Sequence, residues 1–170
     1  MPRLLRPTAA IDPGATGAVA VDSFPTPRVF PCPQDEASLL ALLRRENVGK
    51  VVVENVGQAR AGNGLVSAVK FARHCQMLQS TLRTAGFEVV LIAPSKWIPA
   101  FLGPDKPPFP ISLNAYAALD IKGRNKVDAK YKAIRKKRIL QKVLDITGMS
   151  GVRLAHADAI ALLLYYKGEF

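Results

Sequence analysis

The chain has 170 residues, 49% of them hydrophobic, which is enough to build a core, and we expect residues 1–170 to form one domain. A net charge of +11 is unusual for a metabolic enzyme and indicates a polyanionic partner, nucleic acid before an anionic membrane surface. No apolar run reaches the ~18 residues of a membrane span, and the first residues lack the apolar segment of a secretory signal. Cys32 and Cys75 have neither metal-site nor disulfide spacing, so we expect free thiols in a reducing compartment.

The first patterned stretch places one carboxylate at a bend. The apolar run of residues 8–11 ends at Asp12, a Pro-Gly turn follows, and a run of small and β-branched residues leads away. This order predicts a hairpin that holds Asp12 at a sheet edge, with Gly14 and Gly17 allowing positive φ and the close approach of a ligand. The alternative is an ordinary turn in which Asp12 is only the turn former.

The segments that follow predict an α/β sheet. Residues 18–24 and 28–30 alternate as two antiparallel strands, residues 35–46 have the pattern of a helix, and residues 50–54 form a buried strand that ends in Glu54. If the strands at 8–11 and 50–54 pair in parallel, Asp12 and Glu54 lie side by side where such sheets bind ligands. Two adjacent carboxylates repel each other and favour a bound divalent cation, whereas Glu54 alone is also explained as a solvated strand end.

The middle of the chain alternates loops and helices. Residues 55–64 are glycine-rich around Arg60 and Asn63, which suits phosphate contact or a plain connecting loop. The pattern predicts a long helix over 65–84, a strand over 87–92, and a helix beginning at Pro94 or Ser95. In this last helix we expect Trp97 to be a packing residue and Lys96 to contact DNA. The proline-rich segment 103–110 is expected to be a mobile arm or a connector.

Positive charge is concentrated between Lys122 and Lys142. Ten Lys and Arg occur in these 21 residues, against Asp128 alone. Like charges at helical spacing destabilise an isolated helix, so this density favours a polyanion opposite it, although a charge run is also typical of a solvated face. The segment predicts sequence-independent contact with a phosphate backbone. The residues that we expect to make it are Lys126, Lys130, Arg135, Lys136, Lys137 and Arg138.

The last segment, residues 151–166, predicts an apolar helix whose first turn holds His156 and Asp158. Its small residues would let it lie close against a sheet. If it packs beside the strands at 8–11 and 50–54, Asp158 joins Asp12 and Glu54 at one point. The alternative is that His156 or Asp158 only caps the helix.

In order and spacing, these motifs resemble the RuvC-type Holliday junction resolvases of the ribonuclease H-like superfamily over about residues 8–166. The motifs are Ile11-Asp12-Pro13-Gly14 with Thr16-Gly17, Val51–Glu54, and His156–Ala159. Residues 94–97 and the loop after Glu54 look closer to the phage-encoded and chloroplast members. The resemblance implies an α/β, ribonuclease H-like fold with a mixed five-stranded sheet flanked by helices. It also implies a homodimer, which we expect to form through the 65–84 helix, and paired, Mg²⁺-dependent nicking of four-way DNA junctions.

The resemblance also implies a metal site. Asp12, Glu54 and Asp158 would bind two Mg²⁺ ions, for which Mn²⁺ would substitute, one activating a water and the other stabilising the leaving 3′ oxygen. Many relatives carry an acidic residue or histidine three positions before the final aspartate, where this chain has Ala155. His156 and Asp128 are the candidate replacements, and His156 would also orient or deprotonate the attacking water. Such a nuclease uses no small-molecule cofactor and acts in a cytoplasm, a nucleoid or an organelle matrix, not outside the cell.

Three alternatives belong to other functional classes. The pattern Asp-x-Gly-x-Thr-Gly from Asp12 to Gly17 also resembles the phosphate loop of sugar kinases and actin-like ATPases, which need two such lobes. A different ribonuclease H-like nuclease would act on RNA or an RNA–DNA hybrid. A catalytically inactive protein would bind junctions without cutting them.

Overall fold

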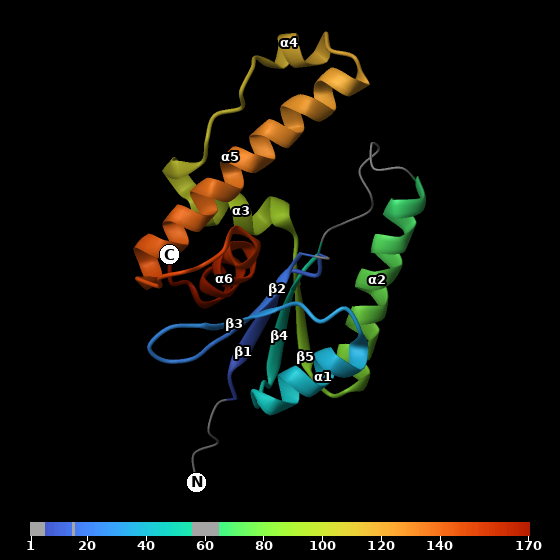
Figure 1. The fold of residues 1–170 in the computed structure, drawn as a ribbon, viewed down its shortest axis with the longest axis vertical. Coiled ribbons are helices and arrows are strands. Elements are labelled where there is room, and N and C mark those ends of the chain that lie inside the picture. Colours follow the sequence, from blue (N-terminus) through green and yellow to red (C-terminus); the bar gives the residue numbers. More distant parts are fainter. Residues whose placement is uncertain (1–5, 15, 56–64) are drawn as a thin grey trace.

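The computed structural model describes residues 6–14, 16–55 and 65–170. Its centre is a five-stranded mixed sheet in the order β3-β2-β1-β4-β5 (Figure 1). Strands β1 to β3 are antiparallel neighbours, whereas β1, β4 and β5 run parallel. The predicted mixed sheet is therefore confirmed, as is the parallel pairing of the first and fourth strands. The strands are β1 (Thr8–Ile11), β2 (Ala18–Val21), β3 (Arg28–Pro31), β4 (Lys50–Glu54) and β5 (Glu88–Ile92).

Helices cover both faces of the sheet. Helices α1 and α2 lie on one face, α3 and α6 lie on the other, and α5 packs on the outside of α6 (Figure 1). Helix α4 and the first half of α5 extend away from the sheet as an arm. The helices are α1 (Glu36–Arg45), α2 (Leu65–Thr84), α3 (Pro94–Leu102), α4 (Leu113–Ala117), α5 (Ile121–Thr147) and α6 (Leu154–Lys167), with a 3₁₀ turn at Gly103–Asp105.

Strand periodicity decides which side chain faces which helix layer. In β4, Val51 and Val53 join the core under α1 and α2, whereas Val52 joins the core under α6. In β1, Ile11 faces α1 and α2 and Ala10 faces α6. Since successive side chains point to opposite faces, the positions that follow, 12 and 54, lie on the α6 side.

Helix α6 runs antiparallel to β1 and β4, and both ends of the helix show it. Near its end, Lys167 Nζ is 2.8 Å from Asp22 Oδ1, and the amide of Asp22 bonds to the carbonyl of Thr8 at the start of β1. The Lys50 ammonium, at the start of β4, lies 5.6 Å from the centre of the Tyr166 ring. The first turn of α6 is therefore at the carboxyl ends of these strands, as the candidate site requires.

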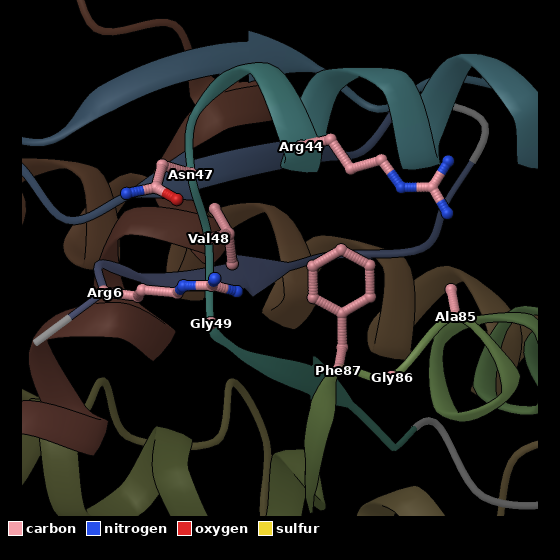
Figure 2. A pocket seen from close by; sticks show the side chains of 8 residues that line it. All are labelled: Arg6, Arg44, Asn47, Val48, Gly49, Ala85, Gly86 and Phe87. Atoms are coloured by element: carbon pink, nitrogen blue, oxygen red, sulfur yellow. The ribbon is translucent and has the colours of Figure 1, made fainter.

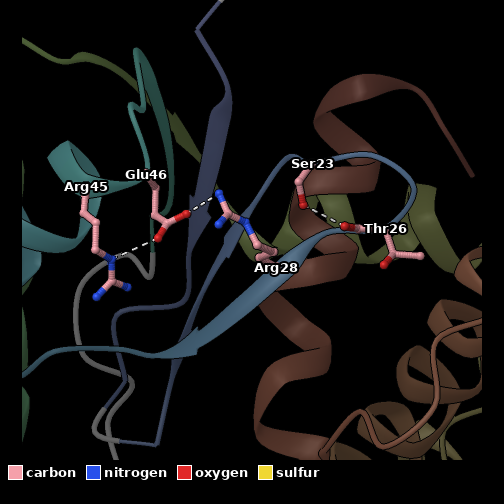
Figure 3. Close-up of polar contacts among 5 residues, drawn as sticks. All are labelled: Ser23, Thr26, Arg28, Arg45 and Glu46. Atoms are coloured by element: carbon pink, nitrogen blue, oxygen red, sulfur yellow. Dashed lines mark hydrogen bonds and ion pairs between the residues drawn. The ribbon is translucent and has the colours of Figure 1, made fainter.

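A buried carboxylate ties the edge strand β3 to α1. Glu46, 6% exposed at the end of α1, forms ion pairs with Arg28 of β3 and Arg45 (Figure 3). Figure 3 also shows the turn between β2 and β3, where Ser23 Oγ donates to the Thr26 carbonyl at 2.7 Å. This turn ends β2 at Val21, three residues before the predicted end, because the chain is already reversing.

The basic segment is a continuous helix. Its 27 residues make α5 about 40 Å long. The Asp120 side chain caps its start by accepting from the Gly123 amide at 2.7 Å, and Gly148 ends it in the left-handed conformation. Segment 103–110 connects α3 to α4, and its Phe109 packs edge-on against the rings of Tyr116 and Tyr131. In the described part of the chain, no helix is both long and apolar enough to cross a membrane.

Candidate metal and nucleic-acid site

Asp12 directly follows β1 in a tight, self-bonded turn. Its amide donates to the Ala18 carbonyl at 3.0 Å, and its Oδ1 accepts from the Gly14 amide at 3.2 Å. A Cβ on Gly17 would lie 2.0 Å from the Asp12 carbonyl oxygen, so only glycine fits there. Neither Gly14 nor Gly17 uses the positive φ that glycine allows. The main chain of the turn itself makes the close approach that requires glycine at position 17.

Glu54 lies at the end of β4, beside Asp12. The register pairs Ile11 with Val53, so the next positions, Asp12 and Glu54, are neighbours across strands about 4.8 Å apart. The Trp97 indole Nε1 donates to Glu54 Oε1 at 3.0 Å. The sequence predicts Trp97 as a packing residue, which is correct as far as it goes, because its side chain is fully buried. The sequence pattern does not predict this hydrogen bond, although a buried indole N–H generally has an acceptor.

Asp158 enters the site from α6, one turn after the helix begins. Its Oδ2 is 2.8 Å from Lys136 Nζ of α5. Burial alone lowers the pKa of Lys136, but its hydrogen bond and charge interaction with Asp158, followed by the charges of Asp12 and Glu54, raise that pKa overall. Helix α6 is capped by neither His156 nor Asp158: the cap residue is Arg153, without a side-chain cap bond. The capping alternative is therefore excluded.

The three carboxylates share one electrostatic field. Burial, followed by the charges of Asp12 and Asp158, raises the pKa of Glu54 to about 7, against an ordinary value of 4.5. Burial and then Asp158 also raise the pKa of Asp12. The Trp97 hydrogen bond and Lys136 oppose the rise at Glu54. A divalent cation would offset the cost of ionising Asp12 and Glu54 beside the charge of Asp158.

The carboxylate oxygens of Asp12, Glu54 and Asp158 are the type of ligand that a hard cation such as Mg²⁺ prefers. Among the described residues, however, no three His, Cys, Asp or Glu side chains converge as they stand into a group that could hold an ion. Asp158 instead has the Lys136 ammonium as its positive partner. Side-chain rotation at Asp158 and Lys136 would be needed for the three carboxylates to share an ion.

Two cysteines lie near the same charges. Burial, followed by the charge of Asp12, raises the pKa of the Cys32 thiol to about 11. Burial, followed by the charges of Glu54 and Asp12, also raises the pKa of the Cys75 thiol. Both cysteines are free, as the sequence predicts, and the structure shows that both are buried. With raised pKa values, neither is an activated nucleophile.

Neither candidate for the fourth ligand lies where the sequence argument needs it. The sequence argument needs His156 in a non-helical segment before the helix, but α6 begins at Leu154 and His156 is its third residue. His156 and Asp158 are two residues apart in the helix, which is a rotation of about 200° around its axis, so their side chains lie on nearly opposite sides of α6. Asp128 accepts from the Tyr116 hydroxyl at 2.9 Å, about 12 Å along α5 from Lys136. The structure therefore supplies no fourth ligand from either position as it stands.

No protein-family model matches this chain, and no curated protein matches its sequence. Solved structures do match. Thermus thermophilus RuvC in complex with a Holliday junction substrate superposes with a TM-score of 0.56 at 20% identity, over 95% of this chain and 92% of that one. A second T. thermophilus RuvC structure gives 0.54 at 21% identity, over 95% and 93%. The chain has the RuvC fold. The predicted ribonuclease H-like architecture is thereby confirmed, while nothing supports the finer likeness to phage or chloroplast members.

On this RuvC fold, the basic residues fall into three groups. Lys126, Lys130, Lys137 and Arg138 are exposed on α5, and Lys96 is exposed in the first turn of α3. Lys136 and Arg135 are half-buried. Lys136 is engaged by Asp158, and the buried Nε of Arg135 has no hydrogen-bond partner in the described part of the chain. Arg60 and Asn63 lie outside the described residues.

A cavity of about 270 Å³ lies at the opposite end of the RuvC-like sheet. It is bounded by the segments that precede β4 and β5, and the side chains of Arg6 and Arg44 border it (Figure 2). These segments are at the amino ends of the strands, so the cavity is distant from Asp12 and Glu54. Arg44 is in the last turn of α1, where a cation complements the helix dipole. This cavity is therefore not part of the carboxylate site.

Proposed function

We propose that this chain is a metal-dependent endonuclease that resolves four-way DNA junctions. One observation carries the proposal: beside a long basic helix on a RuvC fold, burial and the charge of Asp158 raise the pKa of Asp12, and burial and the charges of Asp12 and Asp158 raise the pKa of Glu54. The fold neighbour was solved in complex with a Holliday junction substrate, which supports this substrate class for the present chain.

In this proposal Asp12, Glu54 and Asp158 hold two Mg²⁺ ions, or Mn²⁺ in their place. Bound there, the ions supply Lewis-acid activation of a water and stabilisation of the leaving 3′ oxygen of the scissile phosphodiester. Asp12 is held by its turn and Glu54 by Trp97, so two of the three ligands are positioned in advance. Lys136 leaves Asp158 to the metal and binds a phosphate. His156 is assigned no ligand role, because it lies on another side of α6.

The DNA surface of this proposal is α5 with the segments beside it. The exposed ammonium and guanidinium groups of α5 would bind the phosphates of one duplex arm and fix its position without reading sequence. The residues assigned to this surface are the exposed Lys126, Lys130, Lys137 and Arg138, the half-buried Arg135, and Lys96 of α3. Arg60 and Asn63, which lie outside the described residues, are assigned to the junction centre.

A homodimer through α2 completes the proposal. Paired nicks in a two-fold junction need two sites related by two-fold symmetry, which an isologous dimer provides. Helix α2 lies on the sheet face opposite α6, and it exposes Val69 and Met77, 58% and 47% accessible. Exposed apolar side chains on one helix support that helix as the interface.

The deciding test is cleavage of a synthetic four-way junction with Mg²⁺, compared with linear duplex, an RNA–DNA hybrid, and ATP without DNA. We expect paired nicks in the junction alone, and a loss of several orders of magnitude in Asp12→Asn with junction affinity retained. Preferred cutting of the hybrid would make the chain a different ribonuclease H-like nuclease. Binding without cutting would make it an inactive junction-binding protein, and ATP hydrolysis without DNA would favour the phosphotransferase class.

A further inference from the structure

We propose that Trp97 is a positioning residue for Glu54, in addition to being a core side chain. The inference rests on the proposed function, because it concerns a carboxylate that we assign to metal binding. Its basis is a hydrogen bond of 3.0 Å between Trp97 Nε1 and Glu54 Oε1, made across 43 positions of sequence.

The donor is held by the core and not by the surface. Trp97 is fully buried on α3, and its ring packs edge-on against Phe101 with 6.3 Å between centroids. Both residues belong to the apolar cluster between the sheet and α6. The position of Nε1 is therefore fixed by packing that is present before any ligand arrives.

The acceptor would be mobile without it. A glutamate side chain has three rotatable bonds and loses considerable rotamer entropy when it is ordered. An indole N–H only donates, and Glu54 Oε1 is the acceptor that it meets. With Oε1 engaged in this way, Oε2 and the second lone pair of Oε1 remain available to a cation. Trp97 thus orders Glu54 in advance of metal binding.

Outer hydrogen bonds of this kind orient metal ligands, and removing one typically costs 10- to 100-fold in metal affinity. We therefore expect Trp97→Phe, which keeps an aromatic ring and loses the N–H, to bind Mg²⁺ about 10- to 100-fold more weakly than the wild type. The matched control is Phe101→Leu, which disturbs the same cluster on the same helix but leaves the indole donor in place. Its Mg²⁺ affinity should stay within about 2-fold of the wild type, since the bond to Glu54 is kept.

The measurement is calorimetric titration of the full chain with Mg²⁺ without DNA, so that binding is read independently of cleavage. Unchanged Mg²⁺ affinity in folded Trp97→Phe, or an equal loss in Phe101→Leu, would overturn the inference and leave packing as the whole role of Trp97. If Glu54→Gln binds Mg²⁺ as the wild type does, it is the proposed function that fails, at Glu54 itself.

A second readout remains if Trp97→Phe does not fold. Trp97 is the only tryptophan of the chain, so one indole N–H resonance in an NMR spectrum reports on this bond. We expect that resonance to move when Mg²⁺ is added to the wild type, and the Mg²⁺-induced shift to be lost in Glu54→Gln. If the wild-type chain binds Mg²⁺ but the Trp97 indole resonance does not shift, the inference is contradicted.

Discussion

At the scale of single residues, the turn around Asp12 depends on one glycine more than on the other. A Cβ at position 17 would meet the backbone of Asp12 at 2.0 Å and of Gly14 at 2.8 Å. A Cβ at position 14 would have Asp12 Oδ1 as its nearest neighbour at 3.5 Å, an ordinary contact. Backbone atoms cannot give way as a flexible side chain can, so the two positions should differ sharply.

We expect Gly17→Ala to cost about 3 kcal/mol of unfolding free energy, at the upper end of overpacking penalties, because the turn must open. Gly14→Ala is the matched control and should stay within about 1 kcal/mol of the wild type. Urea unfolding of both variants measures the difference. Equal stabilities would show that the turn does not have the described backbone geometry.

The raised pKa of Glu54 predicts a pH-dependent stability. The folded chain holds this proton more tightly than the unfolded chain, so protonation favours folding. That contribution is complete below about pH 4.5 and is lost as the pH rises through about 7. Without divalent ions, Glu54→Gln should therefore be more stable than the wild type above pH 7, by up to about 3 kcal/mol, and equal to it near pH 4.

Chemical unfolding of wild type and Glu54→Gln from pH 4 to 8.5 in a chelator checks this sign. Added Mg²⁺ at pH 8 should stabilise the wild type and not the variant, because only the carboxylate gains an ion. A stability difference that stays constant with pH would show that the folded-state pKa of Glu54 is not raised.

Asp12, Glu54 and Asp158 could be predicted as candidates because each follows a recognisable local pattern. The partners of two of them could not. Trp97 meets Glu54 across 43 positions and Lys136 meets Asp158 across two helices, and no local pattern encodes such contacts. Lys136 belongs to a run of ten cations, and only the packing of α5 on α6 selects it for the acidic site.

At the scale of elements, periodicity located most strands and helices, since alternation and apolar stripes are local properties. The parallel pairing of β1 with β4 followed from a chirality rule. The arm did not follow from the sequence: segment 103–110 is proline-rich by composition, yet its Phe109 joins Tyr116 and Tyr131 in one aromatic cluster. The conformation of this region depends on contacts between α4 and α5, and the propensities of single residues cannot predict such contacts.

The exposed face of α5 predicts the salt dependence of DNA binding. If Lys130 contacts a phosphate, Lys130→Ala should weaken junction binding and lower the slope of log affinity against log salt by about 1. Arg44→Ala is the control, because it removes the same charge at the opposite end of the sheet. Fluorescence anisotropy of a labelled junction at several salt concentrations separates them. An equal change in both slopes would mean that net charge, and not α5, governs binding.

At the scale of the whole molecule, the arrangement separates two faces. The face with α5 and α6 carries the carboxylates and the basic helix, and the face with α1 and α2 carries the exposed Val69 and Met77. Two copies joined through α2 would leave both carboxylate sites outward. A symmetric dimer that binds one DNA substrate needs its dimer interface and its DNA-binding sites on different surfaces, and this arrangement would provide that separation.

Met77→Asp tests that assembly. A carboxylate buried at an apolar interface should raise the dimer dissociation constant at least about 100-fold, since its desolvation costs about 3 kcal/mol. Phe24→Asp is the control, because Phe24 is 99% exposed on the turn between β2 and β3, away from α2. Light scattering should find monomeric Met77→Asp and dimeric Phe24→Asp, with only unpaired nicks from the former. A Met77→Asp chain that remains dimeric would exclude α2 as the interface.

The ion pairs of Glu46 have a consequence for behaviour in concentrated solution. Strand β3 is an open edge of the sheet, and an unprotected edge invites pairing with another molecule. Here the strand has only four residues, ends in Pro31 and follows Pro27, while Arg28 is drawn sideways to Glu46. The prolines lack amide donors and the charged Arg28 side chain is held by Glu46, so a strand of another molecule would find few hydrogen-bonding partners on β3. These features disfavour edge-to-edge aggregation through β3.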